Sequence, residues 1–201
     1  MALNESDIKQ RILLAAKKLF AEHGFDGTSV RQICEEAGAN VALVSYHFGG
    51  KEKVYQAVLE RFFKENTIDR LSEVPDEPVA GLKLLLGEVV LFSLKDPEIS
   101  TIIERAHLSN SSRAEYMKIY TLPLWKKVRD LLEKGREQGL FRFESLDGAL
   151  VIMMGVALSH KKINGIASLL QDRDKLIEQY PDLIWQVISK ALQIPTEEEQ
   201  S

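Results

Sequence analysis

The stretch that decides the fold is GFDGTSVRQICEEAGANVALVSYHFGGKEK, residues 24–53. Thr28 stands where an N-cap side chain would accept a backbone N–H, so we expect a helix to begin at about Ser29. Gly38 ends this helix, because glycine takes the positive φ that closes a helix C-terminus. The apolar side chains at helical spacing form one face, which consists of Val30, Ile33, Cys34 and Ala37.

A second short helix follows this glycine. Asn40 is a good N-cap for a helix from Val41 to about Tyr46. Val44 and Phe48 are four residues apart, so both can pack inward against the first helix. Helix, glycine turn and helix in this order predict a helix-turn-helix that reads DNA. The side chains left pointing outward are mostly small: Val41, Ala42, Ser45 and Tyr46.

Small outward side chains let a helix sit deep in a major groove. Val41 or Ala42 could touch a thymine methyl group, and Ser45 could hydrogen-bond a base edge or a phosphate. The net charge of −4 does not by itself suggest a nucleic-acid partner, and residues 1–53 hold seven basic and seven acidic side chains. We therefore expect local rather than global electrostatic contacts with phosphate. The basic candidates are Arg31, Lys51, Lys9 and Arg11.

Three groups of residues carry a resemblance to a known family. The first is an apolar set early in the chain, the second is the G-F-x-x-T-S-V-x-x-I run at residues 24–33, and the third is A-G-A-N-V-A-L-V-S-Y-H-F-G-G-K-E at residues 37–52. With these runs the chain resembles the TetR family of transcriptional regulators over roughly residues 8–60. The early set consists of Ala15, Ala16, Leu19 and Phe20.

The resemblance implies an N-terminal three-helix DNA-binding domain. It also implies that Tyr46 and His47 contact phosphates, that the helix start at Thr28 contacts the DNA backbone, and that Lys51 anchors a phosphate at the next helix N-terminus, where an anion is favoured. Ser45 stands where many members carry an aromatic side chain, so no operator sequence is carried over. The DNA-binding candidates are Thr28, Ser29, Arg31, Asn40, Val41, Ala42, Ser45, Tyr46, His47 and Lys51.

Length and composition indicate an ordinary globular chain. Its 201 residues suit one or two domains, and 45% hydrophobic content is ample for a core. A single cysteine, Cys34, excludes an intrachain disulfide and is expected to be a small buried hydrophobe. The N-terminus lacks the apolar run of a signal peptide, and the longest apolar run, Ala149 to Leu158, is half of the about 20 residues that a membrane span needs. We expect a cytoplasmic protein, nucleoid-associated when bound to DNA, with no cofactor and no metal.

The rest of the chain predicts helices, so the fold class is all-α, with the helix-turn-helix domain joined to a helical-bundle ligand-binding and dimerisation domain. The prolines between Val74 and Pro78 mark a hinge. The expected divisions are a DNA-binding domain at 1–53, a connecting helix at 54–74, the second domain at 75–195 and a disordered tail at 196–201. The expected helices are 51–71, 79–94, 97–108, 113–138 with a kink at Pro123, 145–170 and 173–193.

Two helices late in the chain are apolar on more sides than one core of the same chain would cover. Ala149 to Leu158 is apolar all round, and the helix near residues 183–194 is similarly broad. Gly155 and Ala157 let helices approach closely, so pairing with a two-fold copy would give an intermolecular four-helix bundle, as the resemblance also implies. A deeply buried monomeric core is the alternative. The interface candidates are Leu150, Met154, Ala157, Leu158, Leu183, Trp185, Val187, Ile188 and Leu192.

A two-fold dimer is what a palindromic operator requires. By analogy with the family, we expect a repressor of transcription that is released when a small-molecule effector of unknown identity fills a pocket in the second domain. Methionines and aromatics at helical spacing are more often plain core, which is the alternative for each residue. The ligand-binding candidates are Phe92, Glu104, Arg105, His107, Met117, Tyr120, Trp125, Met153, Met154 and His160.

Other function classes have weaker support. Glu104 and His107 form an E-x-x-H pair of the kind found in di-iron bundles, but those sites need two such pairs and further glutamates. Gly49-Gly50-Lys51-Glu52 lacks the earlier glycine and the following Ser or Thr of a phosphate loop. No catalytic residues are assigned. A helical module that binds protein rather than DNA stays open, and Lys51→Glu is the expected discriminator, because it should abolish only DNA binding.

Overall fold

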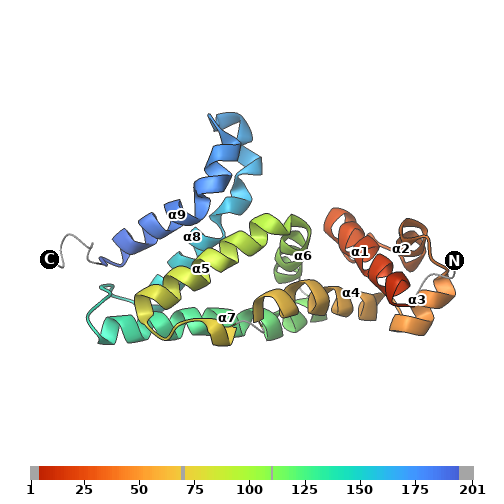
Figure 1. Cartoon of the computed structure of the whole chain (residues 1–201), viewed down its shortest axis with the longest axis horizontal. Coiled ribbons are helices and arrows are strands. Elements are labelled where there is room, and N and C mark those ends of the chain that lie inside the picture. Colours follow the sequence, from red (N-terminus) through yellow and green to blue (C-terminus); the bar gives the residue numbers. More distant parts are fainter. Residues whose placement is uncertain (1–4, 69–70, 110, 195–201) are drawn as a thin grey trace. The chain divides into compact units, whose positions relative to one another are not determined.

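The computed structural model describes residues 5–68, 71–109 and 111–194, and within these ranges every regular element is helical (Figure 1). The all-α prediction is confirmed. The tail predicted at 196–201 lies outside the described residues. The first four helices are α1 (Glu5–His23), α2 (Val30–Ala37), α3 (Val41–Phe48) and α4 (Lys51–Leu59).

The helix-turn-helix forms where the sequence predicts it, with one correction at its start. Ser29, not Thr28, is the N-cap of α2, and its hydroxyl accepts the Gln32 N–H in a capping box. Gly38 ends α2 in the left-handed region at φ 59°, a conformation that other residues adopt at a cost. The Asn40 side chain accepts the Ala42 N–H at 2.9 Å and begins α3.

The single helix expected at 51–71 has two parts. α4 ends at Leu59, and a π-helix, η1 (Glu60–Ile68), continues the path. A π-helix holds i→i+5 hydrogen bonds, so its side chains leave the 3.6-residue period on which the sequence prediction relied. Val58, Leu59 and Phe63 are buried across this change of pitch. After η2 (Leu71–Glu73) comes α5 (Pro78–Lys95).

The chain divides into two compact units. The N-terminal unit comprises residues 1–70 and 96–120, and the C-terminal unit comprises residues 71–95 and 121–201. The sequence prediction placed residues 96–120 in the second domain. In the structure they pack with the N-terminal helices, because α6 (Pro97–Leu108) lies on α1. Lys17 Nζ strengthens that contact with salt bridges to Asp96 at 2.8 Å and Glu98 at 3.1 Å.

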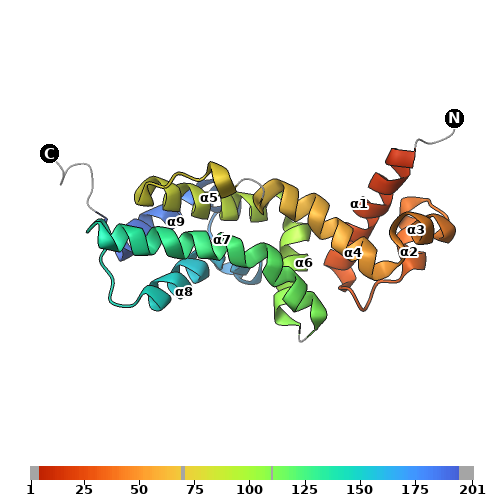
Figure 2. The ribbon, with the colours of Figure 1, turned by 90° about the horizontal axis from the view of Figure 1, so that it is seen from below.

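The N-terminal unit is built around α1. This helix packs on α2, α4 and α6, as Figure 2 shows for α2 and α4, and α3 packs on α2 and α4. α7 (Ser112–Glu137) continues through Pro123, where the sequence predicts a kink, and contributes residues up to Tyr120 to this unit. The buried side chains of α1 and α2 are Ile12, Ala15, Ala16, Leu19, Phe20, Ile33, Cys34 and Ala37.

In the C-terminal unit, α5 packs against α8 (Leu146–Ala157) and α9 (Arg173–Ala191), and α8 also packs on α9. The prediction of one helix at 145–170 is wrong. α8 stops at Ala157, and two short 3₁₀ helices follow, η3 (Ser159–Lys162) and η4 (Asn164–Leu169). The core of the unit includes Leu82, Leu85, Leu86, Val128, Leu132, Phe141, Met153, Ile184 and Ile188.

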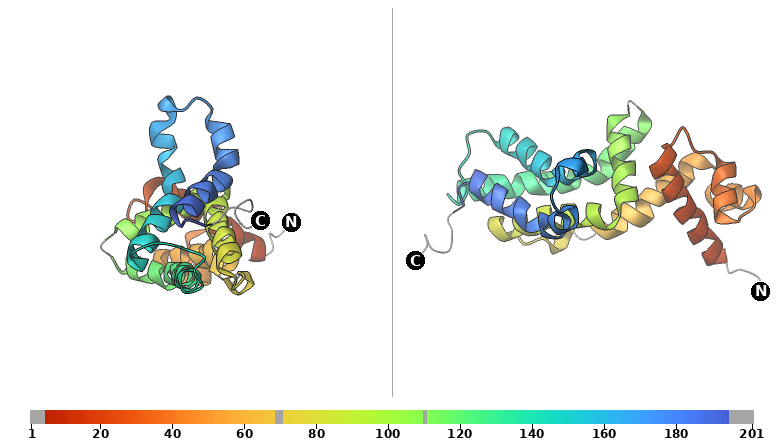
Figure 3. Two further views of the ribbon diagram at one scale, coloured as in Figure 1. Left: turned by 90° about the vertical axis from the view of Figure 1, so that its left-hand side faces the viewer. Right: turned by 90° about the horizontal axis from the view of Figure 1, so that it is seen from above.

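Polar side chains explain the early end of α8. The Ser159 hydroxyl donates to the Val156 carbonyl and shares a hydrogen bond with the Tyr180 hydroxyl at 2.8 Å. The Asn164 carboxamide accepts from Arg173 at 2.9 Å. Serine and asparagine compete with the backbone for hydrogen bonds, and Asn164-Gly165 is a turn signal. Figure 3 shows the resulting segment as a projecting link between α8 and α9. Of the described helices, none is long and apolar enough to cross a membrane.

Candidate nucleic-acid interface

The exposed face of α3 is the best-formed candidate for contact with DNA. Val41, Ala42, Ser45 and Tyr46 all lie at the surface, as predicted, and the side chain of Tyr46 is 80% exposed. Val44 is fully buried, so it anchors the helix against α2. Phe48, predicted to point inward, is half-buried. The small side chains let this face approach a groove closely. The Tyr46 hydroxyl is the one polar group on it that reaches further out.

The flanking polar residues take two different roles. Ser29 and Asn40 use their side-chain oxygens to cap α2 and α3. Arg31 lies on the exposed side of α2 and pairs with Glu35 at 3.0 Å, one turn later. Such an exposed pair contributes little, so the guanidinium can exchange it for a phosphate. His47 lies beside Tyr46, with ring centroids 5.0 Å apart.

Thr28 lies inside the protein, although the resemblance implies contact with DNA at this helix start. The side chain is buried, and its hydroxyl donates to the Leu19 carbonyl at 3.1 Å and to the Gly24 carbonyl at 2.8 Å. Both bonds fasten the start of α2 to the end of α1. In this structure the Thr28 side chain positions the start of α2 and presents no group to solvent.

Lys51 holds the same loop from the other side. Its ammonium donates to the Phe25 carbonyl at 2.9 Å and to the Thr28 carbonyl at 2.8 Å, and it lies 4.2 Å from the centre of the Phe25 ring. An ammonium has three N–H donors, and these two carbonyls use two of them. We call Lys51 with these two carbonyls and the Phe25 ring the Lys51 clamp. The sequence prediction missed it, because Lys51 and its acceptors are far apart in the chain.

Aromatic packing completes this clamp. The Phe25 ring stacks on Phe20 at 5.7 Å and meets Tyr55 edge-on at 5.4 Å, both measured between ring centroids. The Arg113 guanidinium lies 4.2 Å from the Phe25 centroid. The loop at residues 24–28, which leads into α2, is therefore held by α4 and α7 together. The sequence offers one signal for it, the conspicuous Gly24-Phe25 pair, but none that names Arg113.

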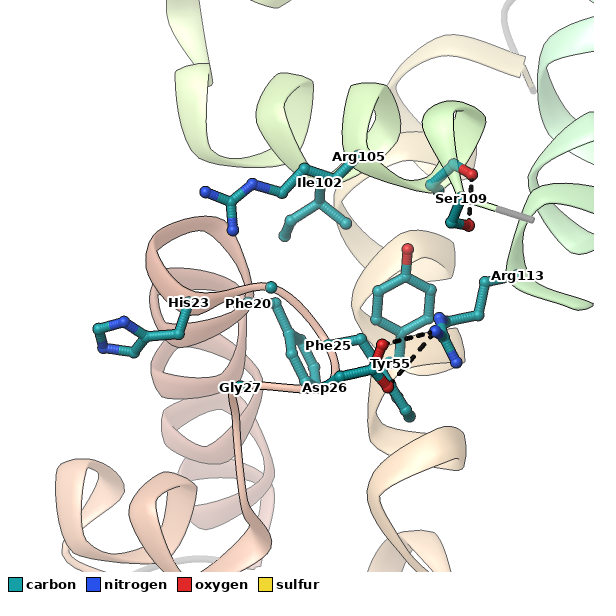
Figure 4. A pocket seen from close by; sticks show the side chains of 12 residues that line it. Phe20, His23, Phe25, Asp26, Gly27, Tyr55, Ile102, Arg105, Ser109 and Arg113 are labelled. Atoms are coloured by element: carbon teal, nitrogen blue, oxygen red, sulfur yellow. Dashed lines mark hydrogen bonds and ion pairs between the residues drawn. The ribbon is translucent and has the colours of Figure 1, made fainter. Parts of the chain in front are cut away.

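A pocket of about 200 Å³ lies behind this loop, within the N-terminal unit. Figure 4 shows loop 24–28 with the Tyr55 ring beside its tip, and α6 and α7 supplying Arg105 and Arg113. Among the ten predicted ligand-binding residues, Arg105 lines it. The full lining is Phe20, His23, Gly24, Phe25, Asp26, Gly27, Tyr55, Ile102, Arg105, Ala106, Ser109 and Arg113.

The predicted ligand-binding set falls into both units, so the structure does not gather it into one. Glu104, Arg105, His107, Met117 and Tyr120 belong to the N-terminal unit, and the other five belong to the C-terminal unit. Arg105 and His107 are exposed. The buried members are Met117, Tyr120, Met153 and His160, and the half-buried ones are Phe92, Glu104, Trp125 and Met154.

The predicted dimer set divides into covered and uncovered side chains. Ala157, Ile188 and Leu192 are buried within the chain, so their side chains fill its own core and do not form an exposed surface. The half-buried members are Leu150, Met154, Leu158 and Trp185, and the exposed ones are Leu183 and Val187. Sequence reasoning missed Val151 and Ile152, which α8 exposes beside them.

In the described part of the chain, no three His, Cys, Asp or Glu side chains are grouped as a metal site would require. Glu104 and His107 share α6 but are not joined by further acidic ligands there. Cys34 is buried, as expected, and burial raises the pKa of its thiol. A capped α2, a glycine turn and an exposed α3 on this scaffold define the class of helix-turn-helix DNA-binding proteins.

Comparisons with known proteins give the family. The family of bacterial regulatory proteins called tetR matches residues 12–58. A linker-substituted mutant of HlyIIR, a hemolysin II transcriptional regulator, is 30% identical, with 94% of this chain and 98% of that chain covered and a TM-score of 0.77. The chain therefore belongs to the TetR family, whose members are DNA-binding regulators and not enzymes.

Two curated relatives are repressors by name. NicS of Pseudomonas putida is 28% identical over 139 residues, which cover 67% of this chain and 66% of NicS. AcnR of Corynebacterium efficiens is 36% identical over 90 residues, which cover 45% of this chain and 42% of AcnR. The chain thus spans less than two thirds of either relative. AibR in complex with isovaleryl coenzyme A and operator DNA shares the fold, with 17% identity, a TM-score of 0.72, and coverage of 94% of this chain and all of that one.

Proposed function

We propose that the protein is a dimeric transcriptional repressor that binds a palindromic operator through α3 and is released by a small-molecule effector. The exposed face of α3 carries this proposal. Its small side chains allow close approach to a major groove, and its 80% exposed Tyr46 supplies a hydroxyl for a phosphate. Val41 and Ala42 are the side chains for thymine methyl groups, and Ser45 is the one for a base edge or phosphate.

A second surface supports the dimer. Val151 on α8 is 66% exposed and Val187 on α9 is 54% exposed, and Ile152 and Leu183 are exposed on the same two helices. Because α8 and α9 pack against each other, these aliphatic side chains belong to one uncovered helix pair. A two-fold copy would cover it with the same surface, and the two copies of α3 would then face two half-sites.

The relatives support repression of transcription and its release by a small molecule. NicS and AcnR are named as repressors, and AibR was solved with both operator DNA and isovaleryl coenzyme A. By analogy, a ligand that prefers one arrangement of the reader shifts operator affinity by its differential binding, typically 5- to 150-fold. The predicted ligand-binding set stays a prediction for the effector site, as does location in the cytoplasm and at the nucleoid.

A selection of genomic DNA tests this function. Purified protein retains fragments at near-physiological salt, and the retained DNA is sequenced, once with the wild-type chain and once with Tyr46→Ala. We expect an enriched palindrome that the variant retains about tenfold less, because a hydrogen bond to a charged phosphate is lost. Glu36→Gln, on the exposed side of α2, is the control. It should retain at least as much DNA as the wild-type chain, because a negative charge is removed.

Tyr46→Ala is a sharper variant than the Lys51→Glu exchange that the sequence suggests. Lys51→Glu would also break the two hydrogen bonds that hold loop 24–28, so lost DNA binding could reflect a damaged reader. Tyr46 makes no comparable structural contact at 80% exposure. A folded dimer that enriches no sequence in the wild-type form would contradict the proposal and favour a module that binds protein.

A further inference from the structure

The pocket behind loop 24–28 has an apolar wall and a polar end. Phe20, Ile102 and Ala106 are buried side chains that line the wall. Tyr55 and Arg113 line it from α4 and α7, and Figure 4 shows both beside the tip of the loop, with the Arg105 guanidinium lying away from them. A pocket of this kind suits a ligand with an apolar body and one polar group.

Tyr55 gives the pocket a hydroxyl donor on a buried ring. The residue is 3% exposed, and in the described ranges no residue hydrogen-bonds its hydroxyl. Figure 4 shows this hydroxyl pointing toward the end of α6 that carries Ser109, across the pocket. Burial raises the pKa of Tyr55 to about 12, so the group keeps its proton at neutral pH and can donate it. Although the ring is buried, the hydroxyl oxygen keeps some accessible surface where it lines the pocket, so it can donate to an arriving acceptor.

Arg113 gives the pocket a cation whose present partner is weakly held. Its side chain is only 17% exposed, whereas that of Asp26, its partner, is 84% exposed. The two hydrogen bonds between them are 3.2 and 3.5 Å long, against about 2.7–2.9 Å for strong charge-assisted bonds. An exposed carboxylate at this distance contributes little, so another oxyanion can replace it.

We propose that this pocket binds the carboxylate group of a small organic acid. The carboxylate accepts hydrogen bonds from the Tyr55 hydroxyl and the Arg113 guanidinium, in the place that Asp26 now occupies, and the apolar body of the acid lies against Phe20 and Ile102. A volume of about 200 Å³ excludes large ligands. The apolar wall favours an acid with a hydrocarbon body over a phosphate, which would need more donors than this end supplies.

The proposed function gives this site a consequence, and that part of the inference depends on it. Loop 24–28 leads directly into α2, and Asp26 is its tie to α7. A bound acid releases Asp26, which removes the ion pair between the loop and α7 and leaves the contacts of Lys51, Phe25 and Thr28 in place. The position of α2 and α3 is then less restrained from α7, so an acid of this class is an effector of DNA binding.

Calorimetric titration of the full chain tests the binding. The probes are benzoate and hexanoate, with benzamide as the neutral match for benzoate and inorganic phosphate as the alternative anion. We expect both acids to bind with one site per chain, benzamide to bind at least about tenfold more weakly, and phosphate to bind more weakly than benzoate.

Three variants locate the site. Tyr55→Phe removes one oxygen and should weaken benzoate about tenfold without lowering the unfolding temperature of the ligand-free chain, because no internal hydrogen bond is lost. Asp26→Asn removes the competing carboxylate and should strengthen benzoate about two- to fivefold. Tyr180→Phe makes the same chemical change in the other unit, where the hydroxyl bonds Ser159, and should leave benzoate affinity unchanged.

Absence of binding by either acid, or equal binding by the wild-type chain and Tyr55→Phe, would overturn the site. Tighter binding of phosphate with the same dependence on the variants would overturn the carboxylate assignment. Operator affinity is then measured with and without saturating benzoate. An unchanged affinity would overturn the effector role alone, whereas failure of the ligand-free protein to retain an operator would instead count against the repressor itself.

Discussion

The exposed surfaces of α3 and of the α8–α9 pair differ in kind. The α3 surface mixes small side chains with a serine and a tyrosine, whereas the α8–α9 surface is aliphatic, with Val151 and Val187 among its exposed members. Both leave apolar groups uncovered. The side chains distinguish them, since hydroxyls beside small side chains suit phosphates and base edges, and exposed aliphatic side chains suit another protein surface.

This difference explains why the two surfaces were not equally predictable. α3 lies between two capping signals, so its exposed residues follow from helix periodicity alone. α8 is apolar all round, so the sequence shows an excess of apolar side chains without showing which of them the chain itself covers. Introducing the same charge on each surface separates their roles.

The largest effect is expected from Val187→Glu on α9. Two-fold pairing would bury this carboxylate twice without a partner, so we expect dimerisation to weaken about 100-fold or more. Sedimentation equilibrium measures it. Leu108→Glu, at an exposed position of α6, is the matched control and should remain dimeric. A Val187→Glu chain that is still dimeric at the same concentrations would place the interface elsewhere.

The reciprocal change is Ala42→Glu on α3. A carboxylate there would face DNA phosphates, so we expect operator affinity to fall about 10- to 100-fold while the dimer and the unfolding temperature stay as they are. Fluorescence anisotropy with labelled operator measures the affinity. The same exchange at exposed Ala80 on α5 provides the control. Unchanged operator affinity in Ala42→Glu would mean that α3 does not enter the groove.

Lys51→Met tests whether this lysine serves the fold as well as the DNA. Loss of the ammonium leaves the Phe25 and Thr28 carbonyls without their donor, so we expect the free energy of unfolding in urea to fall by about 1–3 kcal/mol. If Lys51 also meets a phosphate, the salt dependence of operator binding becomes shallower by about one counterion. Lys53→Met, an exposed neighbour, should change stability little. A stable Lys51→Met chain would argue against the clamp.

The smallest effect concerns the start of α2. Ser29→Ala removes the N-cap oxygen and should cost about 1 kcal/mol, whereas Ser29→Asp keeps an acceptor and should cost less. Thermal unfolding compares the two. Equal losses in both variants would show that the capping box does not stabilise α2.

Local signals explain which parts of the fold the sequence could predict. Gly38 and Asn40 mark the turn, and Pro97 with its preceding aspartate marks α6 at the predicted residues. The end of α8 was missed because Ser159 shares a hydrogen bond with a tyrosine twenty-one residues later in the chain. Periodicity carries no information on such contacts.

The site divides in the same way. The outward face of α3 followed from spacing, but the N-cap predicted at Thr28 was wrong, because that hydroxyl turns inward to carbonyls of α1 and the loop. The pocket could not be predicted, since Asp26 and Arg113 are separated by 87 positions. Residues so far apart in the chain meet only after the chain has folded and α7 packs beside loop 24–28.

The central claim is that two copies of α3 read two halves of one operator. Hydroxyl-radical footprinting on the selected fragment tests it most directly, with Val187→Glu run beside the wild-type chain. We predict that the wild-type dimer protects two symmetric half-sites on one face of the DNA, and that the monomeric variant protects neither at the same concentration. Protection of a single half-site by the wild-type dimer, or equal protection by the variant, would contradict the account.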